Sequence, residues 1–446
     1  MPRVLIVTPE PIGAKMAGPA VRASHIARVL GHSNDVVLAS LEGEGSSPIT
    51  TQEVVDPGTI DVTAFDAAIV QGSALLRLPE LAASELPIVV DWFDPFHLEA
   101  QHRGGGDSVR RRDLIEGARQ TLAQQATRGD FFVCSNEAQR AHWLGWLAHA
   151  GRINAVTTDA DPSMRALLDL ASFGTTPESA KGTSPLRDAF AEIDPEDPVL
   201  LWAGGMHDWL DPVTVVNAMP SLLERHPDAR LVFMAGPHPN TSVEEMGVRG
   251  AAIERSRELK LFGTHVLFAT TWADYDDRLD WFADADIGVL AHPHHLETAL
   301  SHRTRLLDHL TAGLATVSTS GDPLSAQLSA AGAAALVDPG DDVAFADAVS
   351  DLLGDADRMG QMRQTAAALA GQLRWETTLA PLVRWMEAPA MAADRAAGVV
   401  PTATELPAVV TATTRVMERA KMHLDDGGPK QLLERAVGAG RRRLKQ

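Results

Sequence analysis

The sequence predicts an α/β protein of two domains, each built around a parallel sheet. Short apolar runs of strand length recur along the chain, and segments with helical periodicity separate them. This alternation is typical of parallel strands that are joined by right-handed crossover helices. A chain of 446 residues is also longer than a single hydrophobic core usually supports. We therefore expect two doubly wound domains of ordinary size.

The composition excludes several classes of protein. Hydrophobic residues make up 45% of the chain and charged residues 22%, which is typical of a folded globular protein. The apolar runs are shorter than the ~20 residues that cross a bilayer, and the chain begins with a strand pattern rather than a signal peptide, so we expect a cytoplasmic protein. Cys134 is the single cysteine, which excludes an internal disulfide and a Cys-based zinc site. The formal net charge of -20 argues against nucleic acid as a partner.

The N-terminal half begins with a strand followed by a glycine-containing loop and a helix. Residues 3–8 have the pattern of a buried strand, and the next loop contains Gly13 and Gly18 before an amphipathic helix that ends near Gly31. These glycines lack the spacing of a dinucleotide-binding fingerprint, so we do not predict NAD binding. Further strands are predicted at residues 36–39, 67–70, 88–91 and 131–134.

Polar residues cluster just after the strand at 88–91. The sequence DWFDPFHLE places four of them there: Asp91, Asp94, His97 and Glu99. Ligands of open α/β sheets bind at such strand ends. Three carboxylates and an imidazole have the chemistry to hold a metal. The alternative is that Asp94 caps the turn through Pro95 and that one polar group of the cluster faces a substrate hydroxyl.

A segment without apolar periodicity divides the chain. We interpret residues 172–198, which are rich in Thr, Pro, Ser, Asp and Gly, as the linker. A second series of strands follows, and the loops AGGMHDWLDP and AGPHPN come directly after two of them. Glycines at such positions let the backbone approach a phosphate or a sugar closely. Trp272 follows the strand at 265–268, where it is expected either to stack on a base or to lie in the core.

The segment from Asp286 to Ser320 carries the main prediction of a ligand site. A buried strand opens it, a His-rich loop follows, and a helical pattern then ends at Gly313. The loop therefore lies at the C-terminal end of a parallel strand, and the helix N-terminus beyond it offers free N–H groups to a phosphate. Arg303 and Arg305 at that N-terminus are unfavourable for the helix dipole, which indicates an anion that offsets them.

This segment resembles the donor-binding segment of the retaining glycosyltransferases of the GT-B fold, in the large family-four group. Its members carry two Glu residues, separated by seven others, ahead of the helix end. Here Asp308 fills the second acidic position, and Glu297 is the nearest acid to the first, with ten residues between them. The variant ETALSHRTRLLDHLTAGL is similar to a bacterial subgroup associated with surface polysaccharide gene clusters. The similarity extends to WAGGMHDWLDP and GDFFVCSNEAQRAHWLGWL and covers most of residues 1–390.

The resemblance implies a GT-B fold, in which two Rossmann-like doubly wound domains face a cleft and helices follow at the C-terminus. The expected divisions are an acceptor domain at 1–185, a nucleotide-sugar donor domain at 196–372, a crossover helix at 373–390, and a linker with a basic tail at 391–446. The implied reaction moves a sugar from a UDP- or GDP-sugar to an acceptor hydroxyl with retention, in surface polysaccharide or glycolipid synthesis. The expected acceptor is a glycan or a lipid-linked glycan. No metal or other cofactor is implied.

The resemblance also implies roles for residues of the donor domain. Glu297 would hold the donor sugar, Asp308 the ribose, and Arg303 and Arg305 the diphosphate. Gly204, Gly205 and Trp272 complete the expected donor site. The family normally has an Arg and a Lys after the glycine pair, where this chain has Met206 and the sequence LDP instead.

In the N-terminal domain the implied residues are Asp94, His97, Gly18 and Arg22. Asp94 and His97 are catalytic candidates beside Glu297, and the first loop would meet the acceptor or the donor phosphates. The alternative for that loop is a turn glycine and a solvated arginine.

Three alternatives stay open. The chain is expected to be a transferase, but a sugar phosphorylase or an epimerase of the same fold fits the pattern, as does an inactive subunit that only binds a sugar-nucleotide. The missing Arg and Lys after Gly205 favour that last alternative.

At the C-terminal end, GGPKQLLERAVGAGRRRLKQ predicts a basic helix that contacts an anionic membrane surface, with a solvated basic tail as the alternative.

Overall fold

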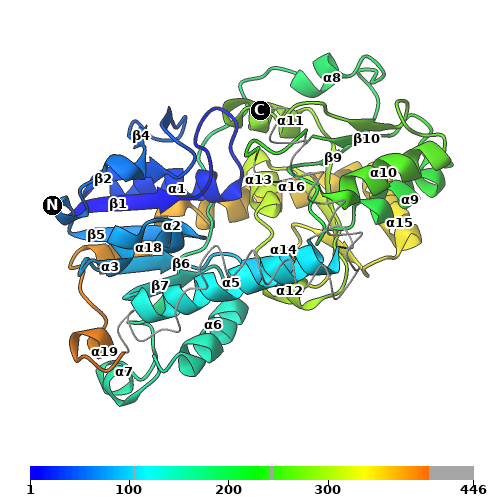
Figure 1. Ribbon diagram of the computed structural model, residues 1–446. Coiled ribbons are helices and arrows are strands. Elements are labelled where there is room, and N and C mark those ends of the chain that lie inside the picture. The colour runs from blue at the N-terminus through cyan, green and yellow to red at the C-terminus, as the bar shows by residue number, and fades with distance from the viewer. Residues whose placement is uncertain (104–106, 235, 242, 244–245, 401–446) are drawn as a thin grey trace, which may run out of the picture.

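The structure is a computed structural model that describes residues 1–103, 107–234, 236–241, 243 and 246–400. Two α/β domains lie side by side, the first in blue and cyan and the second in green and yellow (Figure 1). Each has its own sheet, of eight and six strands, and every strand pair except β3–β4 is parallel. The prediction of two parallel-sheet α/β domains is confirmed.

The sheet of the N-terminal domain has the order β3-β4-β2-β1-β5-β6-β7-β8. Its strands are β1 (Arg3–Thr8), β2 (Asp35–Ser40), β3 (Gly45–Ser46), β4 (Glu53–Val55), β5 (Ala67–Gln71), β6 (Ile88–Asp91), β7 (Phe131–Cys134) and β8 (Leu168–Leu170). The helices are α1 (Gly18–Leu30), α2 (Ala74–Arg77), α3 (Pro79–Ala83), α4 (Phe96–His102), α5 (Ser108–Arg128), α6 (Glu137–His149) and α7 (Ala155–Ala160), with short 3-10 turns at Pro57–Thr59 and Val62–Ala64. The strands on which the prediction rested are buried on both faces, which is why they have continuous apolar runs.

The sheet of the C-terminal domain has the order β11-β10-β9-β12-β13-β14. Its strands are β9 (Val199–Trp202), β10 (Arg230–Phe233), β11 (Val266–Phe268), β12 (Ile287–Leu290), β13 (Ala315–Thr319) and β14 (Ala335–Val337). The helices are α9 (Pro212–Leu223), α10 (Gly247–Glu258), α11 (Arg278–Ala283), α12 (Leu296–Leu300), α13 (Arg305–Ala312), α14 (Pro323–Ala331), α15 (Asp342–Gly354) and α16 (Ala356–Gln372), with a 3-10 turn at Tyr275–Asp277. The strand order reverses between β9 and β12, so the loops after these two strands diverge and leave a crevice.

Two features of the C-terminal domain concern the predicted site directly. Gly313 ends α13 in the left-handed conformation with a φ of 64°, as its position after the helical pattern predicted. The segment before it differs from the prediction, because α12 is a separate short helix ahead of Arg303. Within the segment that we interpreted as the linker, a further short helix, α8 (Pro185–Ala189), packs near α11.

The last helices return to the N-terminal domain. In α17 (Trp375–Thr378) the Trp375 ring stacks on His25, and in α18 (Ala380–Met386) the Trp385 ring stacks on Phe131, with ring centroids 4.5 and 5.5 Å apart. Gly174 is required where the chain passes Trp375, because a Cβ there would lie 2.5 Å from the Trp375 backbone nitrogen. One apolar cluster therefore continues from the first sheet through these helices into the second domain.

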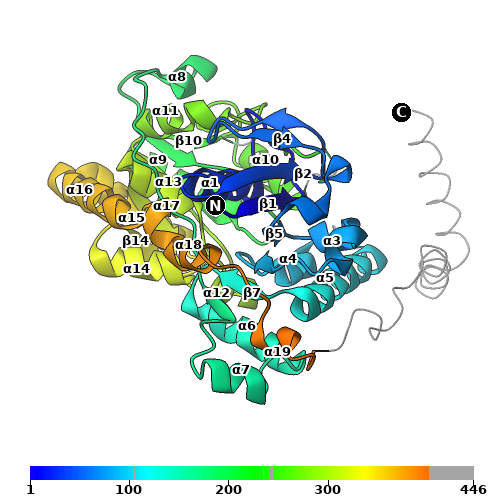
Figure 2. The ribbon, with the colours of Figure 1, turned by 90° about the vertical axis from the view of Figure 1, so that its left-hand side faces the viewer.

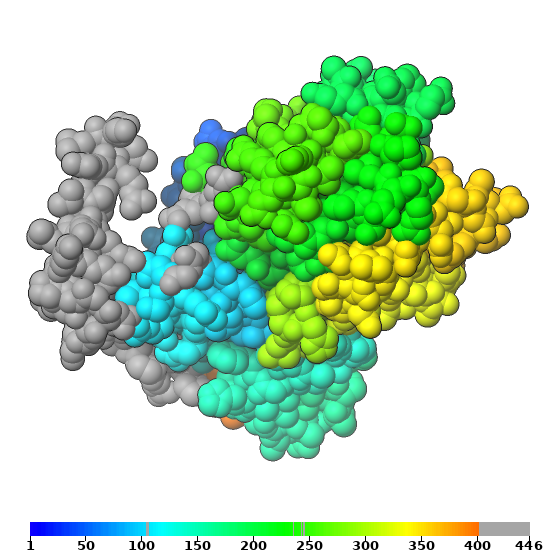
Figure 3. All heavy atoms as spheres, turned by 90° about the vertical axis from the view of Figure 1, so that its right-hand side faces the viewer, coloured from blue at the N-terminus to red at the C-terminus, as the bar shows by residue number. Residues whose placement is uncertain are grey.

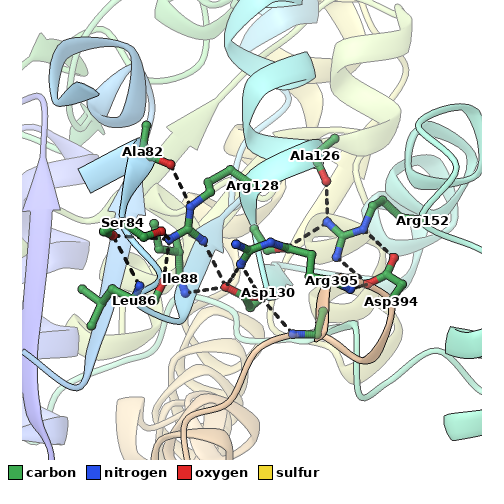
Figure 4. A network of polar contacts seen from close by, with 12 residues as sticks. Ala82, Ser84, Leu86, Ile88, Ala126, Arg128, Asp130, Arg152, Asp394 and Arg395 are labelled. Atoms are coloured by element: carbon green, nitrogen blue, oxygen red, sulfur yellow. Dashed lines mark hydrogen bonds and ion pairs between the residues drawn. The ribbon is translucent and has the colours of Figure 1, made fainter. Parts of the chain in front are cut away.

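The described residues beyond α18 are held to the N-terminal domain by buried charges. Figure 2 shows this part of the chain reaching α19 (Ala393–Ala396), which lies beside α7. Asp394 accepts two hydrogen bonds from Arg152, at 2.7 and 3.0 Å, and both side chains are fully buried (Figure 4). Next to this pair, Asp130 accepts from Arg395 at 2.6 Å and from the Ala392 backbone N–H at 2.9 Å. These pairs could not be predicted from local sequence patterns, since their partners lie far apart along the chain.

No helix in the part of the chain that the structure describes is both long and apolar enough to span a membrane. The predicted basic tail at the C-terminal end lies outside the described residues.

We expect Asp394→Ala to destabilise the N-terminal domain by ~3 to 5 kcal/mol, because Arg152 would stay buried without its charge partner. The measurement is the free energy of unfolding in urea, together with limited proteolysis after residue 388. Asp35→Ala is the matched control, since Asp35 pairs with Arg3 on the surface, and it should cost less than ~1 kcal/mol. An Asp394→Ala variant that unfolds at the same urea concentration as the parent would contradict the assignment.

Candidate active site

A cavity of about 400 Å³ lies between the two domains. From the N-terminal domain it is lined by residues of the loop after β1, the start of α1, and the segment after β6. From the C-terminal domain it is lined by the loops that follow β9, β11 and β12 and by the first turn of α13. The cavity thus occupies the crevice at the strand-order reversal of the second sheet, as expected for a ligand site. Helix α12 packs against α4 and α6 along one edge of this boundary, where Figure 3 shows yellow-green atoms beside cyan and teal ones.

Polar contacts across the boundary hold the two domains together around the cavity. The imidazole of His25 lies 2.8 Å from the Tyr275 hydroxyl, and the Tyr275 backbone N–H donates to the carbonyl of Ala14 at 2.7 Å. On the opposite side of the cavity, the Asn136 side chain donates to the carbonyl of Ser301 at 3.2 Å. These contacts join the two domains beside the cavity, so residues of both domains line one space.

The predicted glycine pair and Arg305 come together in the cavity. Gly204 has a φ of 74°, and a Cβ at this residue would lie 2.8 Å from the Arg305 Nε, so the glycine leaves room for the guanidinium. Arg305 also donates to the carbonyl of Gly205. Burial, and then the charge of Arg303, lower the pKa of Arg305 to about 9, so it still carries its charge at neutral pH. Trp272 lies beside the same loop, 3.4 Å from the position that a Cβ on Gly205 would take.

Glu297 and Arg303 form a buried ion pair at the edge of the cavity. The guanidinium donates to both carboxylate oxygens, at 3.0 and 2.7 Å, and a third hydrogen bond runs to the Thr298 hydroxyl at 3.1 Å. Glu297 is 1% exposed and Arg303 6%. The charge of Arg303 is therefore offset by the chain's own carboxylate. This differs from the expectation that Arg303 and Arg305 would face an anion together.

Asp308 lies on α13 on another side of the same cavity. Its carboxylate is 3.8 Å from the Arg278 Nε, and the Arg278 guanidinium stacks 3.6 Å above the ring of Tyr275. Desolvation in the cavity raises the pKa of Asp308, and the two nearby arginines, Arg278 and Arg305, oppose that effect.

Two carboxyl groups of the N-terminal domain face the Glu297–Arg303 pair. Desolvation, and then the neighbouring charge of Asp91, raise the pKa of Asp94 to about 7. The pKa of Glu99 is raised well above its ordinary value by desolvation and by the charges of Asp94 and Glu297. Both residues line the cavity. The sequence marked Glu99 only as one member of the candidate metal cluster.

The structure gives the members of that cluster different partners. Asp91 is buried and accepts hydrogen bonds from Arg22 and from Gln71 at 2.9 Å. His97 packs against His142, with 3.1 Å between their Nε2 atoms, and burial lowers the pKa of His97 to about 4. No group of three or more His, Cys, Asp or Glu side chains within the described residues is arranged to hold a metal ion.

The two residues predicted on the first loop have different positions. Gly18 opens α1 and lines the cavity. Arg22 is fully buried, where it binds both carboxylate oxygens of Asp91 at 2.7 Å and the carbonyl of Ala171 at 2.6 Å. The alternative of a solvated arginine is therefore wrong. Neither Arg22 nor His97 is among the residues that line the cavity.

Several cavity residues were not predicted. Glu10 directly follows β1, so its place at a strand end was a usable signal, and its carboxylate accepts from Asn240 of the other domain at 3.1 Å. His302 directly precedes Arg303 of the predicted segment, yet burial lowers its pKa to about 4 and its ring stacks on Phe173. Arg103 had no local signal, because only the packing of α4 brings it to the cavity.

The second domain matches a known protein family. Residues 197–355 match the family model described as Glycosyl transferases group 1. This range holds the glycine pair, Trp272, Glu297, Arg305 and Asp308. No curated protein sequence matches the chain.

Solved structures match nearly the whole chain at low sequence identity. Sucrose-phosphate synthase from Thermosynechococcus elongatus has a TM-score of 0.62 and 12% identity, and the match covers 87% of this chain and 100% of that one. HepE from Anabaena, in complex with UDP-glucose, has a TM-score of 0.61, 14% identity and the same coverage. A UDP-forming α,α-trehalose-phosphate synthase from Burkholderia xenovorans has a TM-score of 0.62 and 12% identity over 88% of this chain and 100% of that one. The chain therefore has the GT-B fold, with a domain of the Glycosyl transferases group 1 type at residues 197–355.

Proposed function

We propose that this protein is a glycosyltransferase that moves a sugar from a nucleotide-sugar to an acceptor hydroxyl. The observation that carries the proposal is the position of the Arg305 guanidinium. It lies against Gly204 and Gly205 at the N-terminus of α13, within a cavity between two domains. A cation, a backbone without side chains and a helix N-terminus together suit a diphosphate. The group 1 domain and the UDP-glucose held by the similar HepE structure support the same ligand class.

The donor would lie along the C-terminal side of the cavity. Arg305 and the first turn of α13 would bind the diphosphate and stabilise the charge that develops as it leaves. Trp272 is placed to stack on the base, and Asp308 to accept hydrogen bonds from the ribose hydroxyls. Glu297 would accept from the donor sugar, with the two hydrogen bonds from Arg303 orienting its carboxylate.

The acceptor would enter between Glu297 and the N-terminal domain. Asp94 lines this side, and its ionised carboxylate can accept a hydrogen bond from the attacking hydroxyl. Gly18 at the start of α1 would offer its backbone N–H to the acceptor or to the donor phosphates. Arg22 and His97 would act as positioning residues, Arg22 through Asp91 at the base of the Asp94 loop and His97 through its packing on α6.

The resemblance of the donor segment supports three finer statements, which we include in the proposal. Transfer proceeds with retention at the anomeric carbon, the acceptor is a glycan or a lipid-linked glycan, and the product belongs to surface polysaccharide or glycolipid synthesis. A basic tail that contacts an anionic membrane would bring the enzyme to a lipid-linked acceptor.

We expect Arg305→Ala to weaken UDP or GDP binding by a factor of roughly 10 to 150, because a charge-assisted contact to phosphate contributes ~1.5 to 3 kcal/mol. Isothermal titration of the purified protein measures this directly. Arg358→Ala on the surface of α16 is the matched control and should bind as the parent does. Equal affinities for parent and Arg305→Ala would show that the diphosphate lies elsewhere.

We expect kcat/KM to rise between pH 6 and pH 8 with an apparent pKa of about 7. Asp94 is protonated below its raised pKa and accepts the hydroxyl proton only above it, so activity is lost as the pH falls. A pH profile of the parent beside Asp94→Asn tests this. The acidic limb should be absent from the variant, and a variant with the parent's profile would exclude Asp94 from this role.

We expect activity to survive excess EDTA, since arginine and a helix N-terminus provide the charge that a metal would otherwise provide. Nucleotide release in the presence of acceptor is the assay. Activity that is lost in EDTA and restored by Mg²⁺ or Mn²⁺ would contradict this expectation. It would show that a metal ion stabilises the negative charge of the diphosphate.

A further inference from the structure

Arg103 of the N-terminal domain lines the same cavity as Arg305 of the C-terminal domain. It is the residue at which α4 ends, and the backbone turns there into an extended conformation. The preceding residue, His102, packs against His295 of the other domain with ring centroids 4.2 Å apart. This contact fixes the end of α4 at the domain boundary. Arg103 therefore lines the cavity although its chain position belongs to the first domain.

Arg103 carries no compensating contact of its own. Among the residues that the structure describes, its guanidinium has neither a hydrogen-bond nor an ion-pair partner. The two carboxyl groups that its charge acts on are Glu10 and Glu99, and burial raises the pKa of both. By contrast, Arg303 in the same cavity is neutralised by two hydrogen bonds to Glu297. Of the described arginines that line the cavity, Arg103 and Arg305 are the two that form no ion pair with a carboxylate.

The charges of these arginines converge on the loop that follows the glycine pair. His207 lies on that loop and is stacked on Trp209, with ring centroids 4.6 Å apart. Burial lowers the pKa of His207 well below its ordinary value, and every charge that acts on it lowers the pKa further: Arg305, His238, Arg103 and Arg303. Arg305 of one domain and Arg103 of the other therefore both bring positive charge to this cavity, which suits a ligand with more than one negative charge.

We propose that Arg103 binds the diphosphate of the nucleotide-sugar from the N-terminal domain, together with Arg305 of the C-terminal domain. This inference rests on the proposed function and adds a residue to the donor site. It also accounts for the loop after the glycine pair, which has Met206 and the sequence LDP where a second and a third cation are expected. A cation from the facing domain replaces them, so the diphosphate would bridge the two domains.

Isothermal titration with UDP and with uridine, at low and at physiological salt, tests the proposal on the full-length chain. Arg103→Ala should weaken UDP binding about 10-fold and leave uridine binding unchanged, because only UDP carries the phosphates. The salt dependence of UDP binding should also become shallower than in the parent. Arg103→Lys should recover part of the affinity. Arg111→Ala is the control, since Arg111 is an exposed arginine of the neighbouring helix α5, and it should bind UDP as the parent does.

The outcomes separate this inference from the function on which it rests. If the parent binds UDP, and Arg103→Ala binds it within twofold with the same salt dependence, the inference is wrong and the proposed function stands. If uridine and UDP binding fall equally, Arg103 supports the structure of the site rather than the phosphates, which also overturns it. If UDP binding is unchanged and the KM of a phosphorylated acceptor rises, the arginine belongs to the acceptor side. A parent that binds neither UDP nor GDP would overturn both.

Discussion

The buried pair of Glu297 and Arg303 sets the charge balance of the cavity. The Arg303 guanidinium donates two hydrogen bonds to the Glu297 carboxylate, so its positive charge is largely offset. Arg305 is then the cation of the predicted segment that can attract a ligand. The predicted segment therefore places a cation, Arg305, beside Gly205. Its Glu297 carboxylate also helps to raise the pKa of the carboxyl groups of Glu99 and, as a minor contribution, of Asp94, which line the cavity from the other domain. Breaking a buried pair of this kind leaves an uncompensated charge, so separating Glu297 from Arg303 is costly in free energy.

Contacts between the domains place these charges around one space. His25 and Tyr275 join the domains on one side of the cavity, Asn136 and Ser301 on the other. Helices α17 and α18 and the buried Arg152–Asp394 pair secure the returning chain to the N-terminal domain. Each domain presents some of the polar groups, and between the docked domains lies a desolvated space in which the pKa of Asp94 reaches about 7. A site between domains of this kind suits a reaction with two substrates, one on each side.

The sequence predicted those parts of the fold that depend on local pattern. Buried parallel strands such as β5 and β12 are uninterrupted apolar runs, Gly313 stops a helix, and the glycine pair follows a strand, so each was visible without a partner. Contacts between distant residues were not. Arg22 pairs with Asp91 and Arg152 with Asp394 because the folded chain brings them together, and His97 turns to His142 rather than to the carboxyl groups beside it. The short strands β3 and β4 have too few apolar residues to be recognised.

The central claim is that the cavity takes a nucleotide-sugar, with the diphosphate at Arg305 and the sugar at Glu297. Thermal unfolding in the presence of a panel of UDP- and GDP-sugars, and of UDP and GDP alone, tests it most directly, since a ligand that binds only the folded state raises the Tm. The account predicts that at least one nucleotide-sugar stabilises the parent more than its free nucleotide does, and that Glu297→Gln loses this difference while keeping the response to the free nucleotide. A panel in which no nucleotide or nucleotide-sugar raises the Tm of the parent would contradict it.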